Sequence, residues 1–163
     1  MKASVEWLSE YSDINVDTKE LGDILTMTGS KVETIEQRGK DIKNVVVGKI
    51  VEVTKHPDAE KLVITKVDVG NKILQIVTAA PNIKIGMKDI IVPVALDGSE
   101  LPGGKKINTS KLRGVESQGM MCGMEELDID PAEYPDKEVN GIFILDDKYA
   151  KNIGENIVDV LNL

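Results

Sequence analysis

Apolar and polar positions alternate most regularly over residues 61–69. Every second residue from Val63 to Val69 would lie on one face of a strand, with the intervening residues on the other face. Gly70 and Asn71 then supply a two-residue turn, and residues 72–79 form a second run rich in apolar and β-branched residues. The pattern predicts an antiparallel β-hairpin.

Further extended segments lie on both sides of this hairpin, at residues 45–55, 90–96, 111–122 and 141–145. Pro93 would interrupt a hydrogen-bonded ladder, so an edge position or a bulge is expected there. Residues 98–106 contain several glycines and a proline and are expected to form a loop. No long helical pattern separates the short strands, which favours a small barrel over a sheet of βαβ units.

Helical patterns occur near the two ends of the chain. Ser4 can cap a first short helix, and Asp17, with Glu20 three residues later, can cap a second that ends near Gly29. Residues 31–37 alternate and predict a strand. Residues 155–161 again have helical spacing.

These patterns predict a fold that is mainly β, with an α+β flank. The central part, residues 40–151, is expected to form a five-stranded β-barrel. Residues 1–39 and 152–163 are each too short to bury an apolar face, so we expect them to form together a small split α/β companion domain. The helix at the end of the chain has scarcely begun, so this domain is expected to be truncated at its carboxyl end.

Charge is distributed unevenly along the 163 residues, whose net charge is −8. Both end segments are acidic, whereas the β-rich middle, residues 41–123, has 12 basic and 9 acidic side chains. The simplest interpretation of these basic side chains is that they form an ordinary solvated surface. The alternative is a weakly basic face that could meet nucleic acid despite the acidic total.

Few residues offer catalytic or metal-binding chemistry. The chain has one cysteine, Cys122, and one histidine, His56, which excludes a disulfide framework and argues against a zinc site. His56 has no nucleophile or carboxylate at a recognisable spacing, so a structural role in its turn is expected. Cys122 lies among methionines and is expected to be a small core residue. No apolar run is long enough to cross a membrane, and cytoplasm is the expected compartment.

Two separated motifs resemble a known family. Residues 56–62, His-Pro-Asp-Ala-Glu-Lys-Leu, and residues 111–120, Lys-Leu-Arg-Gly-Val-Glu-Ser-Gln-Gly-Met, are similar to the motifs of EMAP-type tRNA-binding domains, a variant of the OB-fold. The glycines of the second motif, Gly114 and Gly119, permit a sharp bend or a close approach of another chain. The resemblance implies an OB-fold barrel that binds tRNA.

The flanking residues narrow the resemblance. The segment Ser-Val-Glu-Trp-Leu at residues 4–8, with the pattern up to Glu33, is similar to the start of bacterial phenylalanyl-tRNA synthetase β subunits. In that family the subunits assemble as α2β2, and the enzyme uses ATP and Mg²⁺ to join phenylalanine to tRNA. The resemblance implies an amino-terminal fragment that supports this ligase, with no catalytic residue, cofactor or metal of its own.

The barrel face implied by the resemblance is bordered by three segments, at residues 55–61, 82–88 and 111–118. Few aromatic residues are present for base stacking, so binding to tRNA is expected to be weak and directed to the RNA backbone; neither DNA nor a membrane is expected as a partner. The candidate tRNA-binding residues are Lys55, His56, Lys61, Asn82, Lys84, Lys88, Lys111, Arg113, Ser117 and Gln118.

Two other interpretations remain open at this point. The chain could be a free-standing tRNA-binding or tRNA-chaperone module that needs no synthetase partner. It could also be a purely structural module of a synthetase that makes no contact with tRNA. The sequence does not separate these from the first interpretation, nor does it give tRNA specificity.

Overall fold

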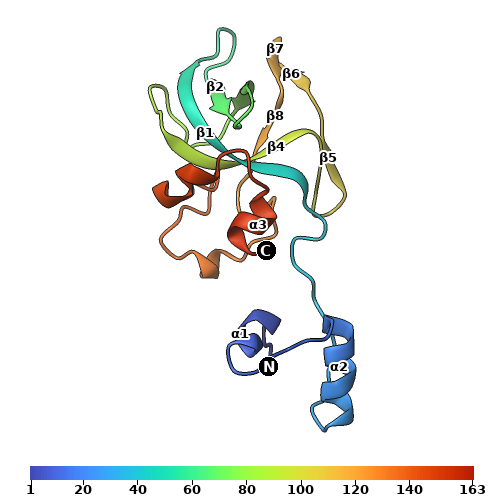
Figure 1. Cartoon of the computed structure of the whole chain (residues 1–163). Helices are drawn as coiled ribbons and strands as arrows, with labels where there is room; N and C mark the ends of the chain where they lie inside the picture. The colour runs from blue at the N-terminus through green and yellow to red at the C-terminus, as the bar shows by residue number, and fades with distance from the viewer. The chain divides into compact units, whose positions relative to one another are not determined.

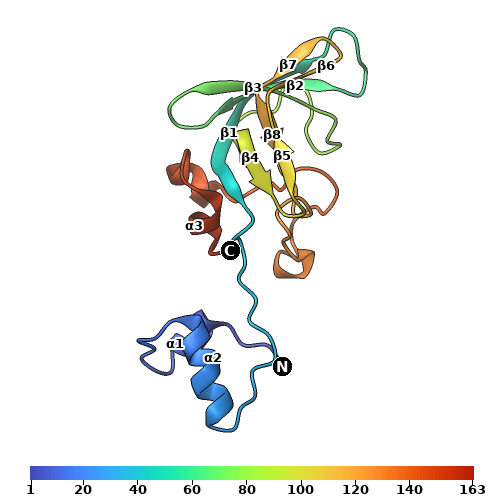
Figure 2. The same cartoon turned by 90° about the vertical axis from the view of Figure 1, so that its right-hand side faces the viewer.

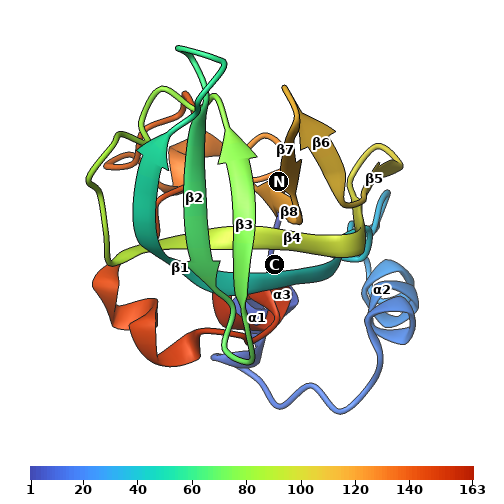
Figure 3. The same cartoon turned by 90° about the horizontal axis from the view of Figure 1, so that it is seen from above.

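The longest strand, β1 (Lys43–Lys55), lies at the centre of a curled antiparallel sheet (Figure 3). The computed structural model describes residues 1–163, which divide into two compact units, residues 1–37 and 38–163. The strand order in the second unit is β3-β2-β1-β4-β5, and β8 also pairs with β4. The strands are β2 (Val63–Asp68), β3 (Ile73–Thr78), β4 (Ile90–Leu101), β5 (Lys105–Ile107) and β8 (Gly119–Met121).

The predicted hairpin is present as β2 and β3. The Val69 amide donates to the Lys72 carbonyl at 3.0 Å, and Gly70 has a φ of 98°. A glycine in the first central position is typical of the type II′ turn, whose twist suits an antiparallel hairpin. Thr65 and Val67 are buried as the alternation predicted. The OB-type β-barrel expected from the sequence is therefore confirmed in its central hairpin and in its antiparallel sheet.

Side chains help to close the barrel between β3 and the β7–β8 segment, where β7 is Val115–Ser117. The Gln118 amide donates to the Gln75 carbonyl at 2.8 Å, and the Gln75 amide donates to Gln118 Oε1 at 2.8 Å. The Ser117 hydroxyl accepts from the Val77 amide at 3.1 Å. These bonds satisfy backbone groups of β3 that would otherwise face an open edge. A separate hairpin, β6 (Ser110–Leu112) with β7, extends from this closure.

The expectation that Pro93 lies at an edge or a bulge is wrong, because β4 is paired on both sides, with β1 and with β8. The Cys122 amide donates to the Pro93 carbonyl, and the Cys122 carbonyl accepts from the Phe143 amide at 3.0 Å. The Phe143 amide thus takes the place of the N–H that Pro93 lacks, and the Cys122 carbonyl is not left unpaired where the ladder with β8 ends.

Two other expected segments also differ in the structure. The region 98–106, expected to be a loop, is mostly strand: β4 continues to Leu101 and β5 begins at Lys105, which leaves a short turn. The segment 141–145, expected to be a strand, makes only a single bridge, between Leu145 and Ile91. The region 111–122 is divided among β6, β7 and β8, because a turn at residues 113–114 and a break at Gln118 interrupt it.

Two apolar clusters are formed by the strongly bent sheet. One fills the barrel and includes Ile50, Val67 and Ile76; the other lies under the segments that follow β8 and is centred on Phe143, which is fully buried. Gly48 on β1 is crowded by side chains of both neighbouring strands, since a Cβ there would meet Val94 of β4 at 2.6 Å and Val67 of β2 at 2.9 Å. The aliphatic composition of the core follows from the scarcity of aromatic residues.

The acidic segment 125–138 contains two prolines, which predict an exposed loop over one side of the barrel; the structure shows that it is only partly exposed. Its carboxylates are mostly exposed, but Leu127 and Ile129 are buried in the Phe143 cluster. A short 3₁₀ helix, η1 (Pro131–Glu133), lies within it. The segment therefore covers one side of the barrel as a packed layer with an acidic outer surface.

The last residues belong to the barrel unit. Helix η2 (Asp147–Asn152) leads to α3 (Ile157–Leu161), which lies below the barrel in Figures 1 and 2. Ile157 and Leu161 are buried in the Phe143 cluster, and the Val47 amide donates to the Glu155 carbonyl at 2.9 Å. The structure shows contacts of α3 with the barrel. The grouping of residues 1–39 with 152–163 as one companion domain stays a prediction.

The amino-terminal unit has two capped helices, as predicted. Helix α1 (Val5–Ser9) is capped by Ser4, and α2 (Thr18–Met27) is capped by Asp17, which accepts from the Glu20 amide at 2.9 Å. The predicted strand at 31–37 is wrong, because the segment has no partner strand and stays irregular. Only Gly22 is buried in this unit. Across the whole chain, none of the helices has the length and apolar character needed to traverse a lipid bilayer.

Candidate nucleic-acid interface

Two of the three predicted border segments meet at one end of the barrel. The corner between β1 and β2 and the β6–β7 hairpin lie together, at the end opposite α3, in both Figure 1 and Figure 2. The chain reverses at the corner because Pro57 cannot extend the β1 ladder. This end of the barrel is called the hairpin end below.

His56 joins the corner to the hairpin. Its ring is fully buried, and the Asp58 amide donates to Nδ1 at 3.0 Å. Nδ1 is therefore an acceptor, so in the neutral ring Nε2 carries the proton and donates to the Leu112 carbonyl, 3.0 Å away. Both ring nitrogens are used in holding backbone, and neither is free for catalysis or for RNA.

The third border segment, residues 82–88, lies beside the end of β1. The Gly86 amide donates to the Val53 carbonyl at 3.2 Å, and the Asp89 amide donates to the Ile50 carbonyl at 2.7 Å. These bonds place Lys84 and Lys88 next to the strand that ends in Lys55. The structure thus places the 82–88 loop beside the end of β1, and the β1–β2 corner that follows β1 contacts the β6–β7 hairpin through His56.

Six cationic side chains of these segments are exposed, and none forms an ion pair: Lys55, Lys61, Lys84, Lys88, Lys111 and Arg113. The same segments hold three carboxylates, those of Asp58, Glu60 and Glu116. The local balance is therefore positive, although the chain as a whole is strongly acidic. Unpaired, exposed cations on separate loops are suited to phosphates of a nucleic-acid backbone.

The other candidate residues have structural partners. Ser117 was expected to offer a polar group at the rim, but it is 2% exposed; its hydroxyl accepts from Val77 and donates to the Gly119 carbonyl. Gln118 uses its side-chain oxygen to hold β3. Ser117 is therefore not at the rim, because closing the barrel requires its hydrogen bonds, whereas Gln118 is half-buried and its place in a tRNA site stays a prediction.

Asn82 is also occupied within the fold. It is 6% exposed, its Nδ2 donates to the Ile142 carbonyl at 2.8 Å, and its Oδ1 accepts from the Ile142 amide at 3.0 Å. The Asn82 side chain thus satisfies both backbone hydrogen-bonding groups of Ile142, as a neighbouring strand would. Asn82 and His56 position the loops that carry cations, and they present no free polar atom to a ligand.

Sequence reasoning missed two exposed apolar side chains among the cations. Leu112 is 40% exposed on the hairpin and Ile85 is 61% exposed on the 82–88 loop. Both residues lie in charged motifs without a regular apolar pattern, so the sequence does not show whether they are buried. Their exposure in the structure shows that they lie on the surface. Leu112 adds apolar surface to the hairpin end, and Ile85 adds apolar surface to the loop beside β1.

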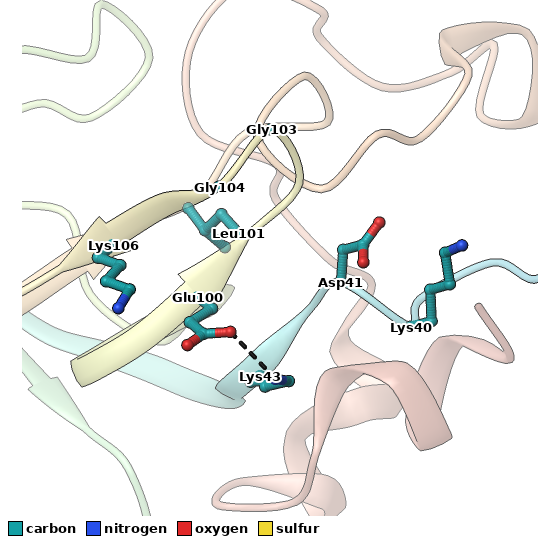
Figure 4. A pocket seen from close by; sticks show the side chains of 8 residues that line it. All are labelled: Lys40, Asp41, Lys43, Glu100, Leu101, Gly103, Gly104 and Lys106. Carbon is teal, nitrogen blue, oxygen red and sulfur yellow. Dashed lines mark ion pairs between the residues drawn. The ribbon is translucent and has the colours of Figure 1, made fainter.

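A hollow of about 330 Å³ lies elsewhere on the barrel unit, between the start of β1 and the β4–β5 turn (Figure 4). Lys43 in this hollow pairs with Glu100 at 3.1 Å, and this hydrogen bond lowers the pKa of the Glu100 carboxyl. Asp41 adds a second carboxylate to the lining, and Lys40 and Lys106 are the other cations there. Its charges nearly balance, which makes it a poorer phosphate site than the hairpin end.

A second hollow, of about 300 Å³, opens beside Met120 and Val139. Glu125 and Glu126 line it and no cation does, so it would repel phosphate. Nearby Cys122 is fully buried, and this burial raises the pKa of its thiol to about 12. The thiol is a core group, as the sequence predicted.

Comparison with known proteins identifies close relatives along the whole chain. It is 54% identical over 164 residues to a phenylalanine–tRNA ligase beta subunit of Clostridium acetobutylicum and 46% identical to that of Clostridium tetani. A third, from Syntrophus aciditrophicus, is 40% identical over 163 residues. Each match covers 100% of this chain but only 19–20% of the relative, so the chain spans about a fifth of their length.

A family model also matches the barrel unit. It is described as "Putative tRNA binding domain" and matches residues 45–148, from β1 to the start of η2. The matched region includes the β1–β2 corner, the 82–88 loop and the β6–β7 hairpin, and it covers well over half of the chain. With an antiparallel barrel whose end gathers unpaired cations, the chain belongs to this family of tRNA-binding domains.

Proposed function

We propose that this chain is a tRNA-contacting region of a phenylalanine–tRNA ligase β subunit, and that it meets the RNA backbone at its hairpin end. The observation that carries the proposal is the gathering of six exposed, unpaired cations on three segments joined by the His56–Leu112 and Gly86–Val53 hydrogen bonds. Binding through so few charges is weak, sensitive to salt and largely blind to base identity.

The names of the relatives support a ligase β subunit as the parent protein, and the family resemblance supplies the rest of the proposed context. The parent protein would be an α2β2 ligase in the cytoplasm that uses ATP and Mg²⁺ to join phenylalanine to tRNA. In this proposal the activation step belongs to other parts of the parent enzyme, and this chain supplies support and tRNA contact.

A structural module is the second candidate, and one observation favours it. Three of the ten candidate residues, His56, Asn82 and Ser117, use their polar side-chain atoms inside the fold, and Gln118 uses its side-chain oxygen there. The family motifs could then exist to build the barrel alone. The two candidates differ in whether the remaining cations touch RNA, and a binding measurement separates them.

Replacing both Lys111 and Arg113 with alanine is expected to flatten the salt dependence of tRNA binding. If each meets one phosphate, the slope of log K against log salt falls in magnitude by about one to two units. The measurement is a titration of tRNA into the chain at several salt concentrations, starting at low salt.

A matched control comes from η2, where Lys148 and Lys151 are exposed at the other end of the barrel unit. The Lys148→Ala/Lys151→Ala variant removes the same charge and should keep the wild-type slope. Equal slopes and affinities for all three proteins would favour the structural module. Equal losses in both variants would mean that net charge, and not the hairpin end, controls binding.

A further inference from the structure

The turn of the β6–β7 hairpin has an unusual residue at its tip. Leu112 pairs with Val115, so the loop consists of two residues, Arg113 and Gly114, with φ values of 51° and 83°. Two positive φ values define a type I′ turn, whose first central position favours asparagine, aspartate or glycine. Arginine has no such preference and bears a steric cost in the left-handed region.

Arg113 differs in residue type from every other non-glycine residue of the chain that has a positive φ. The other non-glycine residues with positive φ are all asparagine or aspartate, at positions 44, 89, 128 and 162. Their short polar side chains tolerate this conformation, whereas the arginine side chain gains nothing from it locally. Arg113 is exposed and forms no ion pair, so no contact within the fold offsets the cost.

A second observation concerns the base of the same hairpin. All three residues of β6 are exposed, so the ribbon has little packing of its own to hold it. The buried Nε2–H of His56 donates to the Leu112 carbonyl, the residue immediately before Arg113. A fully buried ring therefore fixes the strand at the point from which the guanidinium extends.

We propose that the β6–β7 hairpin is a braced, preorganised finger for an RNA phosphate: Arg113 at its strained tip makes the contact, and His56 is the positioning residue that holds it. This inference rests on the proposed function and assigns its main contact. Holding the guanidinium in place before binding lowers the ordering cost of association. A planar guanidinium can also bind a phosphate through two parallel hydrogen bonds, which lysine cannot do.

The first test exchanges the tip residue. Arg113→Asn creates an Asn-Gly turn, so opening of the hairpin, measured by amide exchange in β7, should slow by about fivefold. The same variant should bind tRNA about tenfold more weakly at low salt and lose about one unit of salt slope. Arg113→Lys keeps the charge and the strain, so it should retain the slope but lose part of the affinity.

The second test separates bracing from charge. In His56→Asn the side-chain oxygen can replace Nδ1 as acceptor for Asp58, but no donor reaches Leu112; in His56→Gln the amide nitrogen can replace Nε2. His56→Asn should therefore speed exchange in the hairpin and weaken tRNA binding by roughly three- to tenfold with an unchanged salt slope. His56→Gln should restore most of both, and the melting temperature of each variant checks that the barrel remains folded.

The outcomes distinguish this inference from the proposed function. If the wild-type chain does not bind tRNA, the proposed function fails. If the wild type binds with a clear salt slope but Arg113→Asn keeps that slope, only the assignment of Arg113 fails. If His56→Asn and His56→Gln reduce affinity equally while both are folded, the brace through Leu112 is wrong.

Discussion

Replacing Phe143 with alanine is expected to lower the free energy of unfolding of the barrel unit by about 3–5 kcal/mol. Phe143 is fully buried in the cluster between the sheet and the segments that follow β8. Its ring packs edge-on against Tyr134, with ring centroids 4.9 Å apart. Removing the only phenylalanine of the chain leaves a cavity that short aliphatic neighbours cannot fill, so the cost lies near the upper range for core truncations.

Urea unfolding followed by far-ultraviolet circular dichroism measures this loss. Phe143→Leu is the matched control, because it keeps most of the volume and should cost well under half as much. A loss below about 1 kcal/mol for Phe143→Ala would mean that this layer is loosely packed, contrary to the structure.

Replacing Gly141 with alanine is expected to destabilise the barrel unit by about 3 kcal/mol. Gly141 has a φ of 109°, and an added Cβ would lie 2.2 Å from Asn82 Oδ1. The substitution therefore adds backbone strain of about 1–2 kcal/mol and displaces Asn82 from two buried hydrogen bonds with Ile142, each worth about 1 kcal/mol.

Gly98→Ala is the control for strain without displacement. Gly98 has a φ of 80°, but no atom lies within 4 Å of a Cβ built there. It should lose only about 1 kcal/mol in the same urea titration. Equal losses for the two variants would show that the Asn82 bonds contribute nothing measurable.

The β2–β3 hairpin was predictable from the sequence because its information is local. Strict alternation from Val63 to Val69 set the buried face, and Gly70 supplied the positive φ that the turn needs. The helix caps at Ser4 and Asp17 were likewise determined by residues three positions away. The family motifs correctly located the two segments that meet at the hairpin end.

The errors arose where a distant residue decides the outcome. Pro93 has no N–H to donate to the Cys122 carbonyl opposite it. The backbone amide of Phe143, fifty residues after Pro93, donates to that carbonyl instead, so Pro93 is acceptable in a central strand. Ser117 and Asn82 were predicted to be available to tRNA because they belong to the segments that border the face implied by the family resemblance. Their partners, Val77 and Ile142, lie 40 and 60 residues away, and no local pattern identifies such pairs.

The Arg113 turn was missed for a different reason. The usual sequence indicator of a type I′ hairpin is Asn-Gly or Asp-Gly, and Arg-Gly does not carry it. Only the backbone angles identify the turn. A residue that defies local preference is expected at functional sites, where the surrounding fold holds it in place.

The contact of the hairpin end with tRNA is tested most directly by nuclear magnetic resonance of the isotope-labelled chain during addition of tRNA at low salt. We expect amide signals to shift in the β1–β2 corner, the 82–88 loop and the β6–β7 hairpin, and to return as salt is raised. Signals of η2 and α3, at the other end of the barrel unit, should stay in place. Shifts confined to η2 and α3, or no shifts at low salt, would contradict tRNA contact at the hairpin end.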